Sequence, residues 1–180
     1  MYLTRARYEE IKLEVYKLFR DYNIKKVPID FEELSKKMGI KLISYSSLKK
    51  DQKKKFLNIS KDGLSYLSLK DKCYIIYYND DVAWQRIRFT IMHEIGHIVL
   101  GHTEYSEKNE AEANFFSRSA LAPICLLMKW EISGLEDIVS TFDISYECAK
   151  FISGNLDKRN QSLNKDYAEY ELKLIELFEK

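Results

Sequence analysis

WQRIRFTIMHEIGHIVLG, residues 84–101, combines a strongly apolar background with a few polar side chains at fixed spacing. Its apolar residues recur at helical intervals, so we predict one helix over 82–100 that ends at Gly101. In that helix, His93 and His97 lie one turn apart and point to the same side. Burying polar groups in such a segment costs free energy unless they are paired or ligated. This stretch therefore predicts both a central helix and a functional site on it.

The pair His93 and His97 is spaced to bind one metal ion. Two imidazoles four residues apart on a helix can reach a single zinc ion at about 2.0–2.1 Å. Glu94 flanks the metal without sharing the ligand face, where it can take a proton from water and deliver it to a leaving amine. The alternative is a helix with two ordinary histidines. The chain has 3 histidines, all within 93–102, and this concentration favours a catalytic zinc site with Glu94 as general base.

A catalytic zinc ion usually has three protein ligands and an open position, so a third ligand is needed. His102 is one candidate, but it follows His97 by five residues, whereas the HExxHxxGxxH pattern requires six. Leu100 also replaces the glycine of that pattern. We therefore expect His102 at the rim of the site, where it is a candidate transition-state stabiliser together with Tyr105 and Arg86.

Acidic residues of a second helix, predicted over 108–121, are the other candidates. Glu110 and Asn114 are neighbours on one helix face, so Glu110 could ligate the metal while Asn114 bonds to a ligating imidazole. Glu112 is also available, but it lies roughly 160° away around the helix and is the weaker choice. Glu110 is thus the favoured third ligand, with Asn114 supporting the ligand set.

The rest of the chain predicts an α+β fold with a small antiparallel sheet. We expect an N-terminal helix over 4–22 and a short one from an Asp30 cap to Gly39. Strands are expected over 40–46, 64–69 and 73–78, and the last of these could pair with substrate at its edge. The basic run 49–55 is interpreted as a solvated loop. Helices are expected after Pro123, over 124–131, 135–142, 145–157 and 163–179.

This order suggests a peptidase domain over 1–125, followed by a helical C-terminal region, 126–180, packed on the core. Two short helices within 133–157 loosely resemble a helix-turn-helix. The second has only Lys150 as a basic residue before Asp157, whereas phosphate binding normally needs a basic stripe. We therefore favour docking of a protein over DNA binding.

Composition limits the classes of function. With 180 residues the chain can bury a core without a structural metal, so a bound metal is expected to be catalytic. The net charge is +1, which gives no argument for a nucleic-acid or membrane partner. The 3 cysteines are widely spaced and are expected to be reduced thiols. Because no signal peptide or membrane span is evident, we expect a cytoplasmic protein.

Three blocks of the sequence resemble the ImmA/IrrE family of metallopeptidases: RFTIMHEIGHIVLGH at 88–102, EAEANFF at 110–116 and LAP at 121–123. Their order and spacing are similar to that family's pattern. One departure is Ser117, where alanine is common in the family, and this could alter packing beneath the site.

The resemblance implies a zincin-like core with a gluzincin site. His93 and His97 would be ligands, Glu94 the general base and Glu110 the third ligand. It also implies a cytoplasmic endopeptidase that cleaves a helix-turn-helix repressor and relieves repression, in a mobile element or prophage. The alternative is a zinc-containing regulator that docks on a transcription factor without cutting it, because its ligand set would look the same.

Overall fold

The computed structural model of the chain describes residues 3–161 and 166–179, and they form the α+β arrangement that the sequence predicts. The elements, in chain order, are α1 (Arg5–Asp21), α2 (Phe31–Lys37), β1 (Lys41–Ser44), the 3₁₀ helix η1 (Tyr45–Ser47), α3 (Lys50–Ile59), β2 (Gly63–Ser68), β3 (Cys73–Tyr78), α4 (Trp84–Val99), α5 (Glu107–Leu121), α6 (Ile124–Lys129), α7 (Leu135–Phe142), α8 (Tyr146–Asn160) and α9 (Glu169–Phe178).

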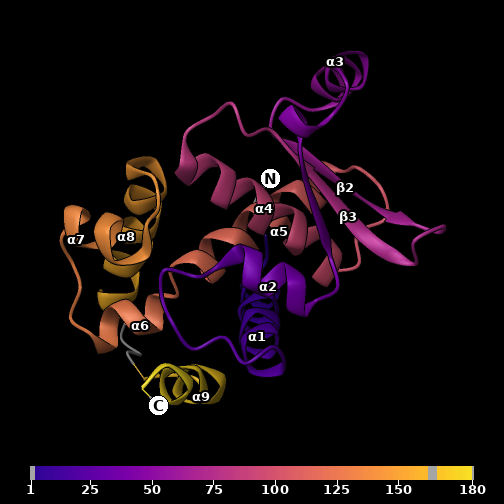
Figure 1. Cartoon of the computed structure of the whole chain (residues 1–180). Coiled ribbons are helices and arrows are strands. Elements are labelled where there is room, and N and C mark those ends of the chain that lie inside the picture. Colours follow the sequence, from indigo (N-terminus) through magenta and orange to yellow (C-terminus); the bar gives the residue numbers. More distant parts are fainter. Residues whose placement is uncertain (1–2, 162–165, 180) are drawn as a thin grey trace.

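Helix α4 lies at the centre of the molecule (Figure 1). It packs against β2 and β3 on one side and against α5 on another, while α1 covers α5. Ile91, Met92 and Ile95 of α4 are fully buried. The helix ends as predicted, since Gly101 follows with a φ of +70°, a conformation that glycine adopts without steric cost. The apolar composition of the HExxH segment therefore reflects burial on several faces.

Close packing of α4 against α5 depends on Gly96. A Cβ atom at this position would lie 3.0 Å from Cδ1 of Phe116, a fully buried side chain of α5. Ala113 of α5 is also fully buried. Small residues on the facing sides thus let the two helices that carry the candidate ligands approach each other.

The three strands form a mixed sheet in the order β1-β3-β2. β2 pairs antiparallel with β3, as predicted, but β1 pairs parallel with β3, so the prediction of a purely antiparallel sheet is wrong. A parallel pair needs a long crossover, and the connection from β1 to β3 contains α3 and β2. The prediction that 73–78 offers a free edge is also wrong, because β3 is the central strand. Strand β2 lies at an edge of the sheet.

The basic run expected as a loop is instead helix α3, Lys50–Ile59. Lysine and glutamine are good helix formers, and the Gln52 side chain accepts a hydrogen bond from the backbone N–H of Lys49 at the helix start. Phe56 anchors the helix, with ring centroids 4.3 Å from Tyr77 and 5.7 Å from Tyr45. The charge of the segment suggested a solvated loop, but the two aromatic contacts of Phe56 hold the segment against the rest of the protein as a helix.

The C-terminal helices continue the same hydrophobic core, which extends from Ile11 to Ile175. Asp143, the C-cap of α7, accepts hydrogen bonds from Trp84 Nε1 at 2.7 Å and Gln85 Nε2 at 3.2 Å, both on α4. The boundary drawn between residues 125 and 126 stays a prediction.

The last helix is shorter than the predicted 163–179, since α9 begins at Glu169. Residues 163–165 of that prediction lie outside the described residues. None of the helices in the described ranges has the length and apolar character that a membrane span requires.

Burial predicts unequal reactivity of the three thiols. Cys125 and Cys148 are buried, which raises their pKa values to about 12 and about 11, whereas Cys73 is partly exposed. We expect one thiol per folded chain to react rapidly with a disulfide reagent at pH 8, and all three in urea, because the thiolate is the reactive form. Cys73→Ser should remove the rapid phase. A second rapid thiol would contradict the packing of α6 and α8.

Candidate metal centre

Three side chains from α4 and α5 converge on one point. His93 Nε2 lies 3.0 Å from His97 Nε2. Glu110 places Oε2 3.3 Å from His93 Nε2 and Oε1 3.3 Å from His97 Nε2. These donor atoms could together hold a metal ion. The structure thus brings together the three residues that the sequence analysis selected as ligands.

Local structure explains why these residues meet. His93 and His97 are one turn apart on α4, as the spacing requires. Ser106 caps α5 by accepting a hydrogen bond from the Asn109 backbone N–H at 3.0 Å, and this places Glu110 in the first helical turn. A carboxylate is favoured there because the helix dipole is positive at its N-terminus.

Both histidines are held in the state that binds metal ions. Burial lowers the pKa of His93 to about 4, although Asn114 acts in the opposite direction. Burial, reinforced by repulsion from His93, lowers the pKa of His97 to about 4. Both imidazoles are therefore neutral at pH 7 and keep a lone pair for a metal ion.

Glu94 lies beside the cluster but is fixed by the sheet. Its side chain is buried, and Ser65 Oγ of β2 donates a hydrogen bond to Glu94 Oε2 at 2.7 Å. Burial raises the pKa of Glu94, and the bond from Ser65 only partly offsets this. A carboxyl whose pKa is moved toward neutrality is better suited to exchange protons.

We expected His102 at the rim of the site, but it lies beneath the cluster. Its side chain is only 7 % exposed, its Nδ1 lies 2.9 Å from His97 Nδ1, and its Nε2 lies 3.1 Å from Glu112 Oε2. Glu112 points away from the ligands, as predicted, and also pairs with Arg7 of α1. Burial acts to raise the pKa of Glu112, but hydrogen bonds from Arg7 and His102 outweigh it, so the pKa is lowered.

The other candidates for transition-state stabilisation differ in their surroundings. Tyr105 is 81 % exposed on the loop before α5. Arg86 is engaged by Asp62 through two hydrogen bonds of 2.6 and 2.9 Å. Their roles stay predictions.

Asn114 lies close enough to the His93 imidazole to act on its pKa. His93 Nδ1 is nevertheless buried without a well-formed hydrogen bond to any described residue. The predicted support of His93 by Asn114 therefore stays a prediction. Ser117, the departure from the family pattern, is fully buried, and its hydroxyl donates to the Asn114 carbonyl at 3.0 Å. Its polar group is therefore accommodated within α5.

Two residues of this site were not found from the sequence. Ser65 belongs to an alternating strand pattern, which predicts a strand but not a contact with Glu94. Arg7 is 105 positions from Glu112 and is one of several basic residues on α1. Only the burial of Glu112 could have indicated its contact with Arg7, because a buried carboxylate requires a cationic partner. The sequence did not suggest that Glu112 is buried.

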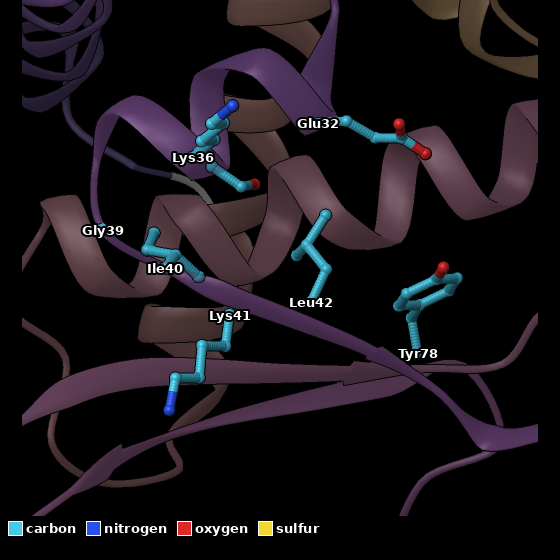
Figure 2. A pocket seen from close by; sticks show the side chains of 8 residues that line it. Glu32, Lys36, Gly39, Ile40, Lys41, Leu42 and Tyr78 are labelled. Carbon is cyan, nitrogen blue, oxygen red and sulfur yellow. The ribbon is translucent and has the colours of Figure 1, made fainter. Parts of the chain in front are cut away.

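A hollow lies elsewhere, between α2 and β1 (Figure 2). It has a volume of about 520 Å³, and Glu32, Lys36, Leu42 and Tyr78 are among its lining residues. It shares no residue with the metal cluster. We assign the candidate site by the convergence of metal-ligating atoms rather than by the volume of a hollow.

Two histidines of an HExxH helix that meet a glutamate of the next helix, with a buried carboxylate alongside, are typical of metallopeptidases. Comparison with family models agrees, since residues 36–151 match the family described as IrrE N-terminal-like domain, Peptidase_M78. Because the match spans more than half of the chain, the chain belongs to this family of metallopeptidases, and the resemblance to ImmA/IrrE proteins is confirmed. The matched range includes α6, α7 and part of α8. A comparison with curated proteins found no match.

The geometry predicts that Glu110 is a ligand. Glu110→Gln should weaken binding of Zn²⁺, used as a probe, by more than about 100-fold, since residues that only contact a ligand already change affinity by about 10–100-fold. Competition with a fluorescent chelator measures this. Glu107→Gln, an exposed change in the same helical turn, is the matched control and should bind like the parent chain. Equal affinities for parent and Glu110→Gln would remove Glu110 from the ligand set.

Proposed function

We propose that the chain is a zinc-dependent endopeptidase with a gluzincin-type site. The observation that carries this proposal is the convergence of His93, His97 and Glu110. Ligands placed tetrahedrally at about 2.0–2.1 Å from zinc lie about 3.3 Å from one another. The two imidazole nitrogens lie 3.0 Å apart, and each lies 3.3 Å from a different oxygen of the Glu110 carboxylate. Neutral imidazoles and a carboxylate are also ligands that zinc accepts.

Zinc held there would activate a water molecule and polarise the scissile carbonyl. Glu94 is placed to accept the proton of that water and to donate it to the leaving amine. Ser65 holds one of its oxygens, so the other oxygen, Oε1, would exchange the proton. Burial of Glu94 keeps bulk water from competing for this step.

The free edge of the sheet offers a way to bind an extended substrate. β2 is one of the two edge strands, the other being β1, and a hydrogen bond from Ser65 joins β2 to Glu94. A peptide that added to β2 by backbone hydrogen bonds would run past the catalytic carboxylate. Tyr66 and Leu67 on the same strand are 44 % and 48 % exposed and would contact its side chains. We therefore place substrate binding on β2 rather than on β3.

We further propose that the substrate is a helix-turn-helix repressor in the cytoplasm, cut so that repression is relieved, in a mobile element or prophage. Helices α7 and α8 would contribute to docking. Phe151 is 40 % exposed, and the Arg118 guanidinium lies 4.1 Å from its ring centroid. Arg159 is bound by Glu171 through bonds of 2.5 and 2.7 Å, so it is not free for phosphate. This charge distribution supports a protein partner over DNA.

Incubation with a helix-turn-helix repressor encoded beside this chain tests the proposal. With Zn²⁺ present, mass spectrometry should show two repressor fragments that sum to the intact mass plus one water. Glu94→Gln should retain Zn²⁺ and reduce the cleavage rate by at least about 100-fold, because general acid–base catalysis contributes about 10²–10⁴-fold.

Glu176→Gln, an exposed charge-matched change on α9, away from the cluster and from the proposed docking helices, is the control and should cleave like the parent. Cleavage by Glu94→Gln at the parent rate would contradict the mechanism. An intact repressor in a stoichiometric complex with the zinc-loaded parent would favour the non-proteolytic regulator instead.

A further inference from the structure

A row of hydrogen-bonded side chains leads from α1 to the metal cluster. His97 Nδ1, on the opposite side of the ring from the cluster, lies 2.9 Å from His102 Nδ1. His102 Nε2 lies 3.1 Å from Glu112 Oε2, and the same oxygen accepts a hydrogen bond from Arg7 Nη2 at 2.5 Å. We call Arg7, Glu112 and His102 the supporting row.

The chemistry of these groups fixes the position of every hydrogen in the row. His97 must present an unprotonated Nε2 to bind a metal, so its single ring proton is on Nδ1. That proton can only be donated to His102 Nδ1, which must then be an acceptor. The ring proton of His102 is therefore on Nε2, where it is donated to Glu112. A carboxylate only accepts hydrogen bonds, so every hydrogen bond between His97 and Glu112 is donated in the direction of Glu112.

The reverse arrangement is disfavoured at both ends. If His102 Nδ1 donated to His97, the proton of His97 would move to Nε2 and block the metal position. The Nε2 atom of a neutral His102 would then direct a lone pair at the Glu112 carboxylate, and two buried acceptors would face each other without a proton. A doubly protonated His102 would keep the bond to Glu112 but would still place the His97 proton on Nε2.

We propose that Arg7, Glu112 and His102 are positioning residues that hold His97 in the orientation and tautomer required for metal binding. This inference rests on the proposed zinc site. It assigns a role to His102 that is neither a ligand nor a contact to substrate, and it makes α1 part of the metal centre.

Burial strengthens the hydrogen bonds of the supporting row. The side chains of Glu112 and His102 are only 2 % and 7 % exposed, so water competes little for their hydrogen bonds. Arg7 balances the charge of Glu112, and Lys108 Nζ lies 3.7 Å from its other oxygen. A buried carboxylate without such partners would be costly, so the cations keep Glu112 ionised and able to accept from His102.

Zinc affinity of the full chain tests this role. His102→Ala should weaken Zn²⁺ binding by about 10–100-fold, as loss of a residue that orients a ligand typically does. His102→Gln retains an acceptor and a donor in one planar group, so it should recover most of that loss. An affinity for His102→Gln no better than that of His102→Ala would overturn the directional hydrogen bonding.

Arg7→Gln tests the far end of the row by a change at a side chain that is 30 % exposed. It should also weaken Zn²⁺ binding, by less than His102→Ala. Arg5→Gln is the matched control, an exposed change of the same charge on the same helix, and should bind like the parent. Equal effects of the two arginine changes would contradict a specific role for Arg7.

Nitrogen-15 NMR of the zinc-loaded chain supplies a readout that a merely structural role would not change. The chain has 3 histidines, so their ring signals are readily assigned. The parent should show the ring proton of His97 on Nδ1 and that of His102 on Nε2, and His102→Ala should lose the protected Nδ1 proton signal of His97. A zinc-loaded parent in which His102 carries its ring proton on Nδ1 would overturn the proposal.

The outcomes separate this inference from the proposed function. If the parent binds Zn²⁺ and His102→Ala binds it equally well, the supporting row is overturned while the zinc site stands. If the parent does not bind Zn²⁺ at all, the zinc-dependent function fails, and this inference fails with it.

Discussion

Close contact between α4 and α5 is the constraint on which the site depends. The two histidines are aligned by a single helix, but the glutamate comes from another, and only close packing brings it within 3.3 Å of both imidazoles. Gly96 favours this packing, because a Cβ atom there would lie only 3.0 Å from Phe116. The glycine of the HEIGH motif thus serves the metal centre through packing, without any polar contact of its own.

Several polar groups on α4 are buried at considerable cost, and three of them contact different neighbouring segments. Arg88 is 4 % exposed and lies 3.5 Å from Asp143 of the C-terminal region, while Glu94 bonds to β2. His97 contacts His102, which follows the helix. The helix is therefore fixed along its length by directional contacts as well as by apolar packing, which favours a single arrangement of the ligands.

Sequence patterns predicted the parts of the site that are local. His93, His97 and Glu94 follow from one helical turn, and Glu110 was favoured by its position relative to Asn114. The direction of β1, the helix α3 and the contact of Ser65 with Glu94 were not predicted, because each depends on how distant segments meet. The location of His102 was misjudged for the same reason. Its spacing excluded it as a ligand, but spacing contains no information about Glu112 and Arg7 beneath it.

The pairing of Arg7 with Glu112 joins positions 105 residues apart, and this has a consequence for the order of assembly. During synthesis α1 leaves the ribosome long before α5 exists, so neither Glu110 nor the row behind His97 can be in place while the HExxH segment is still emerging. The pair of histidines alone is a weak chelator. Assembly of all three candidate ligands therefore requires the long-range packing of α4 and α5, and metal binding at the proposed site would be a late event in folding rather than its nucleus.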